Sequence, residues 1–410
     1  MAKSMTILCV PCMAKVVARH DGVGWWLTMS RDPIVSRRAV LAAAGVSSLV
    51  AMAGCTSKST GADGDPSTAP SGSATSGPGV TDVVTGLQAP WSVVWADGAA
   101  LISQRDDAHI RQLVDGRLRD VFTVPGVKHG GEGGLLGMAV SGGWLVVYFT
   151  AEDETNQVVR YRWSRRGGSV RLSGRQQILD GIPAGVVHNG GRVEFGPDGK
   201  LYISTGDSTR RELAQDRSSL AGKILRMEPD GAVPDDNPFS GSRVWSMGHR
   251  NVQGMAWAAD RTMFAVEFGE NTWDELNVIV PGDNYGWPVY EGRAKTDFDT
   301  SLVPHDTQSA RYRNPVQQWP TSEASPSGMA ILGNTIYIAA LGGQRLIVVP
   351  VARPSTSKQY FVRTYGRLRD VVVAPDKSLW VLTNNTDTRG DPRPGDDRIL
   401  RVDPEQLTTT

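Results

Sequence analysis

From residue 81 onward the chain alternates short apolar runs with polar turns that often contain Asp and Gly. The clearest turn, Gly196-Pro197-Asp198-Gly199-Lys200, is followed directly by the β-rich run Leu201-Tyr202-Ile203-Ser204. A similar turn, Ala374-Pro375-Asp376-Lys377, precedes Ser378-Leu379-Trp380-Val381-Leu382. Polar turns between apolar runs of this length are typical of β-hairpins, so the pattern predicts antiparallel strands.

The same unit, two strands joined by a polar turn, recurs along the chain. No segment keeps a 3.6-residue hydrophobic period over three turns, as a helix would. Imperfect repeats of this kind predict an all-β fold, a six-bladed β-propeller of four-stranded antiparallel blades, with a β-sandwich as the alternative. The repeats cover Trp91–Leu113, Leu135–Trp163, Gly191–Met227, Gln253–Val280, Gly328–Pro350 and Leu368–Val402.

The N-terminal region follows a different pattern. Ser36-Arg37-Arg38 precedes an apolar run that is too short and too rich in Ala and Gly to span a membrane, and the run ends at Met52-Ala53-Gly54-Cys55. The paired arginines resemble a twin-arginine export signal, and the end resembles a bacterial lipobox. We therefore expect residues 29–54 to be a lipoprotein signal and Cys55 to carry a lipid anchor. The expected location is extracytoplasmic, tethered to the bacterial cell membrane.

Two flanking segments complete the expected domain organisation. Met29 is a plausible true start, so residues 1–28 are interpreted as a start-site artefact. Residues 55–80 are rich in Ser, Thr, Gly, Pro and Ala, contain too few apolar residues to pack a core, and are predicted to be a flexible tether. Residues 81–410 form the propeller domain. Cys55 would then be the only cysteine, so no internal disulfide is expected.

Charge and standard motifs exclude several function classes. The chain has 43 basic and 43 acidic residues, and its basic excess lies in the N-terminal signal region. The folded part therefore offers no electrostatic case for nucleic acid, and a lipid anchor is the only membrane contact expected. Glycine motifs that bind dinucleotides or phosphates are absent from the sequence, as is a Cys/His metal cluster.

Two segments contain residues suited to acid–base or electrostatic chemistry. His188 lies in Val187-His188-Asn189-Gly190-Gly191, just before an expected strand. Its imidazole could accept a proton from a substrate hydroxyl, or it could be an ordinary loop residue. Arg250, in Gly248-His249-Arg250-Asn251, could stabilise a carbonyl oxygen that gains negative charge, or pair with an Asp between blades.

Two further segments suit ion binding. The acidic segment 267–277, followed by Tyr285, offers carboxylate and carbonyl oxygens to a hard cation, although a solvated loop is the alternative. Arg367 and Arg369 share one face of an expected strand, so together they could bind a polyanionic ligand.

In combination these motifs resemble a known family, the soluble quinoprotein glucose/sorbosone dehydrogenases, and most closely its aldose sugar dehydrogenase branch. The resemblance covers roughly Gln88 to Val402. It rests on six motifs in order: His188-Asn189-Gly190-Gly191-Arg192, Gly248-His249-Arg250-Asn251, Asp274-Glu275-Leu276-Asn277, Asn284-Tyr285-Gly286-Trp287-Pro288, Trp319-Pro320-Thr321 and Arg367-Leu368-Arg369-Asp370.

The resemblance implies a propeller that holds pyrroloquinoline quinone (PQQ) near its axis. It implies that His188 is the general base and that Arg250 polarises the quinone carbonyl. The implied calcium sites are a catalytic one at the carbonyls of Gly269 and Glu270 and a structural one at Glu275 and the Tyr285 carbonyl. The implied cofactor-binding residues are Glu132, Arg250, Asn251, Trp319, Thr321, Arg367 and Arg369.

The expected function is oxidation of a sugar or polyol hydroxyl by hydride transfer to PQQ, with the electrons then passed to an external acceptor. Three positions depart from the family pattern: Glu132 replaces a usual Gln, Val187 an Asp, and Gly342 falls near a usual Lys. Two alternatives remain open. The first is a cofactor-free propeller that binds glycan or protein, and the second is a calcium-dependent lactonase.

Overall fold

The computed structural model describes residues 4–9, 14–20, 25–30, 79–293 and 312–407. The chain divides into two compact units, residues 1–72 and 73–410. In the first unit, three strands form an antiparallel sheet in the order β1-β2-β3. These are β1 (Ser4–Cys9), β2 (Ala14–His20) and β3 (Trp25–Ser30). Cys55 and almost all of the expected signal and tether lie outside the described residues.

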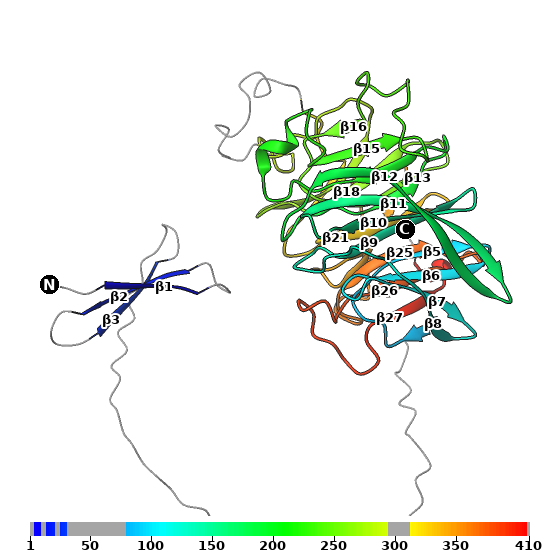
Figure 1. Ribbon diagram of the computed structural model, residues 1–410, viewed down its shortest axis with the longest axis horizontal. Coiled ribbons are helices and arrows are strands. Elements are labelled where there is room, and N and C mark those ends of the chain that lie inside the picture. The colour runs from blue at the N-terminus through cyan, green and yellow to red at the C-terminus, as the bar shows by residue number, and fades with distance from the viewer. Residues whose placement is uncertain (1–3, 10–13, 21–24, 31–78, 294–311, 408–410) are drawn as a thin grey trace, which may run out of the picture. The chain divides into compact units, whose positions relative to one another are not determined.

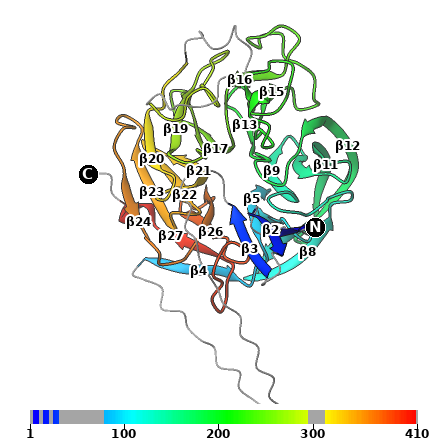
Figure 2. The ribbon, with the colours of Figure 1, turned by 90° about the vertical axis from the view of Figure 1, so that its left-hand side faces the viewer.

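The second unit is a ring of six four-stranded antiparallel sheets, the blades (Figures 1 and 2). Blades 1 to 3 consist of β5 (Pro90–Ala96), β6 (Ala99–Gln104), β7 (His109–Val114) and β8 (Arg117–Thr123); β9 (Leu135–Ser141), β10 (Trp144–Thr150), β11 (Thr155–Arg166) and β12 (Ser169–Pro183); and β13 (Val193–Phe195), β14 (Leu201–Ser204), β15 (Lys223–Met227) and β16 (Val244–Met247). Blades 4 to 6 consist of β17 (Val252–Trp257), β18 (Met263–Glu267), β19 (Trp273–Ile279) and β20 (Gln317–Pro320); β21 (Pro326–Leu332), β22 (Thr335–Ala340), β23 (Arg345–Pro350) and β24 (Lys358–Tyr360); and β25 (Leu368–Val373), β26 (Leu379–Thr383), β27 (Arg398–Val402) and β4 (Val80–Thr85).

Blade 6 closes the ring by combining both ends of the propeller chain. Its outer strand β4 comes from the start of the domain and pairs antiparallel with β27, from Arg398 opposite Thr85 to Val402 opposite Val80. The pairing gives β27 the neighbour that it would otherwise lack and makes β4 the outer edge strand of blade 6. Ring closure therefore joins the N- and C-terminal parts of the domain by main-chain hydrogen bonds.

The prediction of a six-bladed propeller is confirmed, and the β-sandwich alternative is excluded. Every predicted repeat contains strands of a single blade. The helical segments of the described residues are two short 3-10 turns, η1 (Arg211–Ala214) and η3 (Pro404–Gln406). None of the helices in the described part of the chain is long and apolar enough to cross a membrane.

The hydrophobic core lies between neighbouring blades. Leu136 and Val146 of blade 2 pack in one cluster with Leu201 and Leu225 of blade 3, and all four are at most 1 % exposed. Blades 6 and 1 meet in the same way through an edge-to-face pair of Trp380 and Trp95, whose ring centroids are 5.4 Å apart. The faces of each blade are therefore covered by its neighbours, which explains why apolar residues are frequent on both faces of the strands.

Candidate active site

Loops from several blades line a cavity of about 360 Å³ at one end of the ring. Two kinds of connection reach it. Arg105 and Asp387 follow the second strand of their blades, whereas His188, Arg250 and Arg367 precede the first strand of the next blade. Because successive strands are antiparallel, both kinds of connection lie at the same end of the strands, and the Asp-containing hairpin turns lie at the other end.

His188 is held by a buried carboxylate. Its Nδ1 lies 2.8 Å from Oδ1 of Asp207, which is 0 % exposed. The same oxygen accepts a hydrogen bond from the backbone N–H of Thr209 at 2.8 Å, and Oδ2 accepts one from Nε1 of Trp287 at 2.8 Å. A carboxylate only accepts hydrogen bonds, so Nδ1 of His188 carries the hydrogen and its Nε2 lone pair is free to take a proton.

The loop that carries His188 has a tightly constrained backbone. His188 has a φ of 62°, in the left-handed region that few non-glycine residues adopt. A Cβ on Gly206 would lie 1.9 Å from the His188 carbonyl oxygen, so only glycine fits beside it. The His188 N–H donates to the carboxylate of Glu132 at 2.9 Å. These contacts hold the imidazole at the cavity wall before any ligand binds.

Arg250 presents a guanidinium with unused donor capacity. Its Nη1 donates to the carbonyl oxygen of Gly269 at 2.7 Å, and its buried Nε has no hydrogen-bond partner. The guanidinium lies 5.3 Å from the ring centroid of Trp287, a favourable cation–π contact. Burial lowers the pKa of Arg250 from its usual value. A ligand oxygen carrying negative charge would satisfy both the free donor and the buried cation.

Arg369 is a buried cation held by neutral groups. Its guanidinium donates to Oε1 of Gln253 at 3.1 Å and to Oδ1 of Asn384 at 3.1 and 3.2 Å. Within the described part of the chain, no carboxylate forms an ion pair with it. Burial, together with the nearby charges of Arg105 and Arg367, lowers its pKa to about 9. Such a group is costly without an anion, so the cavity favours an anionic ligand.

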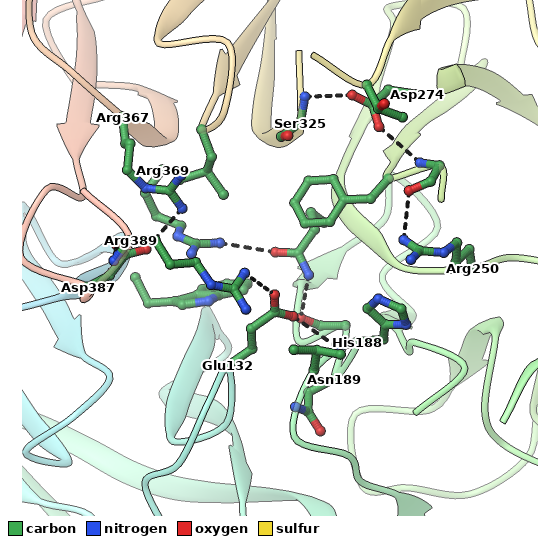
Figure 3. A pocket seen from close by; sticks show the side chains of 18 of the residues that line it. Glu132, His188, Asn189, Arg250, Asp274, Ser325, Arg367, Arg369, Asp387 and Arg389 are labelled. Atoms are coloured by element: carbon green, nitrogen blue, oxygen red, sulfur yellow. Dashed lines mark hydrogen bonds and ion pairs between the residues drawn. The ribbon is translucent and has the colours of Figure 1, made fainter. Parts of the chain in front are cut away.

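Arg367 adds a second binding group on the same side of the cavity. Its Nη2 pairs with Oδ2 of Asp387 at 3.1 Å, and its buried Nε is without a partner. Figure 3 shows Arg367 and Arg369 on one side of the cavity, with His188 and Arg250 on the other. An anionic ligand between the two sides would contact both arginine groups next to a base. The residues present therefore fit a polycarboxylate such as PQQ.

Glu132 does not leave an unpaired negative charge in this cavity. One of its carboxylate oxygens accepts from the His188 N–H, and the other pairs with Nη1 of Arg389 at 2.5 Å. Burial would raise the pKa of Glu132, but Arg389 and the hydrogen bond from His188 together hold it below its ordinary value. The departure from the family's usual Gln is thus compensated by a neighbouring arginine.

The two expected calcium sites differ in how well their residues are already satisfied. The Gly269 carbonyl accepts a hydrogen bond from Arg250, and the Glu270 carboxylate pairs with Arg211. Both residues line the main cavity, and the groups named here already have partners within the protein. The first site would therefore depend on the main-chain carbonyls that the resemblance implies.

Glu275 and Tyr285 line a second, smaller cavity with Glu291. Burial and the nearby charge of Glu267 raise the pKa of Glu275 to about 8, and Oε2 of Glu291 is buried without a partner. These oxygens fit a cation. In the described residues no three His, Cys, Asp or Glu side chains converge as metal ligands do. Main-chain oxygens such as the Tyr285 carbonyl would have to complete the coordination.

Two of the residues expected to bind the cofactor lie outside the main cavity. Thr321 lines it, but Asn251 is 0 % exposed and its Oδ1 accepts a hydrogen bond from the Gly190 N–H at 3.0 Å. Trp319 is 5 % exposed and packs in the core, with Nε1 3.3 Å from Oγ of Ser357. Asn251 therefore supports the loop that carries His188, and Trp319 supports the blade below Thr321.

Sequence reasoning missed several groups that contribute to this site. Asp207 orients the base, and Arg105 and Arg389 add positive charge to the cavity wall. Asp274 also lines the cavity, and burial raises its pKa to about 7. Arg105 directly follows the second strand of its repeat, and Asp207 follows the second strand of another within a few residues. That recurring position is the signal that could have revealed them.

Fold and site together define a six-bladed propeller with an arginine-lined cavity for an anion beside a histidine–aspartate pair. The chain belongs to the glucose/sorbosone dehydrogenase family, whose model matches residues 87–392. The resemblance inferred from the sequence is thereby confirmed.

Individual relatives agree with this assignment. The PQQ-bound aldose sugar dehydrogenase from Streptomyces coelicolor is 44 % identical, with a TM-score of 0.73 over 79 % of this chain and 97 % of that chain. Quinoprotein glucose dehydrogenase B from Acinetobacter calcoaceticus is 30 % identical over 51 % of this chain and 52 % of that protein. Aldose sugar dehydrogenase YliI from Escherichia coli is 35 % identical over 48 % and 58 %. The matches to these last two relatives span just over half of their lengths.

Proposed function

We propose that this protein is a PQQ-dependent dehydrogenase that oxidises a hydroxyl group of a sugar or related polyol. The observation that carries the proposal is the arrangement of the main cavity. A histidine with a free Nε2, held by Asp207, faces two arginines across the cavity. Arg367 pairs with Asp387, whereas the buried Arg369 forms no ion pair with a carboxylate within the described residues. The family assignment and the names of the relatives support the same conclusion.

The cofactor-binding residues follow from the charges in the cavity. Arg367 and Arg369 would hold the carboxylates of PQQ, and Arg250 would face its quinone oxygens from the opposite side. Bound PQQ would supply the electron-pair acceptor that takes a hydride from the substrate carbon. A calcium ion at the Gly269 and Glu270 carbonyls would add Lewis-acid character, and a second ion at Glu275 would be structural.

His188 would provide general-base catalysis. As a hydride leaves the substrate carbon, the hydroxyl on that carbon must lose its proton, and Nε2 of His188 is the group placed to accept it. Asp207 stabilises the resulting imidazolium through the hydrogen bond to Nδ1. The fixed guanidinium of Arg250 offers positive charge where negative charge develops. The electrons then pass to an external acceptor.

Reconstitution with calcium and PQQ tests this function. We expect PQQ to raise the melting temperature only when calcium is present. A hundred-fold excess over Kd corresponds to about 2.7 kcal/mol of added stability. The reconstituted protein should reduce an artificial dye in the presence of aldoses or polyols, and a chelator should abolish both effects. Arg369→Met keeps roughly the length of the buried side chain but removes its charge. This variant should therefore lose most of the PQQ-induced rise in melting temperature.

The other outcomes distinguish the alternatives. If PQQ does not change the melting temperature at any calcium concentration, the proposed dehydrogenase function is wrong. A propeller that binds glycan or protein then remains. Hydrolysis of sugar lactones with calcium alone, without dye reduction, would identify a lactonase.

We further propose that the propeller is exported and held at the cell membrane by lipid on Cys55, since paired arginines, an apolar run and the cysteine occur in the right order. Cys55→Ser should move the protein from the membrane fraction to the soluble fraction without changing its melting temperature. A nearby Ser57→Ala variant should remain in the membrane fraction. Equal membrane fractionation of the two variants would contradict the lipid anchor.

A further inference from the structure

Trp287 is a buried side chain beside the site, and it has no role in the chemistry proposed above. It belongs to the connection between β19 and β20 and is 4 % exposed. Its backbone is held on both sides: its N–H donates to the Gly248 carbonyl at 3.0 Å, and its carbonyl accepts from Nε2 of Gln215 at 2.6 Å. The indole is therefore held at a fixed position beside the loop that carries Asp207.

The indole N–H of Trp287 contacts the carboxylate that orients the base. Nε1 donates to Oδ2 of Asp207 at 2.8 Å. Oδ1 of the same carboxylate accepts hydrogen bonds from Nδ1 of His188 and from the backbone N–H of Thr209. Each oxygen thus has its own donor, and the plane of the carboxylate is fixed. Asp207 is 0 % exposed, so water does not readily replace a lost donor.

The ring of Trp287 also contacts the positive side of the site. The guanidinium of Arg250 lies 5.3 Å from the ring centroid, and that of Arg211 lies 5.5 Å from it. Both distances are within the range of a cation–π attraction. Arg211 in turn pairs with Glu270, which lines the cavity. One side chain therefore contacts the partner of the base and the guanidinium expected to stabilise developing charge.

We infer that Trp287 is a positioning residue that holds Asp207 so that His188 keeps its hydrogen on Nδ1 and its Nε2 free for the substrate proton. The kinetic part of this inference rests on the proposed dehydrogenase function. The structural part does not, because the contacts belong to the protein alone. Trp287 is not expected to touch the substrate.

Loss of the indole N–H would release one side of the carboxylate. Asp207 could then rotate about its side chain, and the Nδ1–H tautomer of His188 would lose its fixed acceptor. Part of the population would carry the hydrogen on Nε2, where it blocks proton acceptance. The affinity for substrate and PQQ depends on other groups, so the turnover number should change more than KM.

Nitrogen NMR of the cofactor-free protein tests the tautomer directly. The His188 signals are identified by their loss in His188→Gln. We expect the unmodified protein to show the Nδ1–H tautomer, and Trp287→Phe to show a mixture with Nε2–H. Trp245→Phe is the matched control. It makes the same change at a half-buried tryptophan that packs on Tyr202 in blade 3, and it should leave the His188 signals unchanged.

The second measurement uses the enzyme loaded with PQQ. Trp287→Phe should lower kcat by up to about a hundred-fold, the scale of a misplaced catalytic group, with a much smaller change in KM. If Trp287→Phe does not fold, replacing the indole by benzothiophene retains the ring contacts and removes only the N–H. An unchanged tautomer in the folded variant overturns the inference. A protein without PQQ-dependent activity overturns the proposed function instead, while the NMR spectrum still decides the role of Trp287.

Discussion

Replacing His188 by Ala is expected to lower the turnover number by about a hundred-fold or more, the contribution of a well-placed general base. PQQ binding should survive, because Arg367 and Arg369 lie on the other side of the cavity and do not contact the imidazole. The rate of the hydride-transfer step is measured by stopped-flow reduction of bound PQQ with an aldose. Binding of PQQ is measured by the rise in melting temperature that it causes.

The matched control for this prediction is His129→Ala. His129 is an exposed histidine that pairs with Asp106 and does not line the cavity, so its variant should keep normal turnover. Near-normal turnover in the His188 variant with PQQ bound would contradict the assignment of the base. Asp274, a cavity-lining carboxyl whose pKa is raised to about 7 by burial, would then be the next candidate.

Arg250→Ala is the second large effect that we expect. Removing one fixed donor to a developing negative charge typically costs about a hundred- to a thousand-fold in turnover. Here it also leaves the Gly269 carbonyl without its guanidinium partner. Arg250→Lys should recover only part of the loss, because an ammonium group keeps the charge but lacks the two-pronged geometry. Steady-state kinetics with saturating PQQ separates the catalytic effect from weaker cofactor binding.

A surface arginine is the control for the loss of charge. Arg401 is 46 % exposed in its side chain and pairs with Asp376, so Arg401→Ala should behave like the unmodified enzyme. If Arg250→Ala retains full turnover at saturating PQQ, the guanidinium serves only to support the Gly269 loop.

The candidate site was predictable in its parts but not in its pairings. His188, Arg250 and Arg367 each precede the first strand of a blade, and Arg369 lies near the start of such a strand. All four line the same cavity. The pairing of the base with its partner was not predictable. Asp207 follows the second strand of a repeat, which places it at the cavity end of the blade, but it is 19 positions from His188 in the chain and its own segment does not show which residue it contacts.

The sequence motifs also did not show which of their side chains are buried. Asn251 adjoins Arg250 and was expected to contact the cofactor, yet its side chain turns into the protein to hold Gly190. Trp319 is close in sequence to Thr321 but packs in the core, because it lies within β20, whereas Thr321 follows the end of that strand and lines the cavity. A motif shows which residues are near one another in the chain, but not which of them face the cavity.

By itself the sequence determined the strands, the sixfold repeat and therefore the propeller, because alternating apolar runs and tight turns are local signals that each segment carries. Only the tertiary structure decided which charges meet. Closing the ring through β4 and β27 brings loops from distant blades to one cavity. There Arg389 pairs with Glu132, which is 257 positions away in the chain. Trp287 donates a hydrogen bond to Asp207, which is 80 positions away. Such contacts depend on the path of the whole chain, since electrostatic and hydrogen-bonding energies depend on distance in space and on burial rather than on separation in sequence.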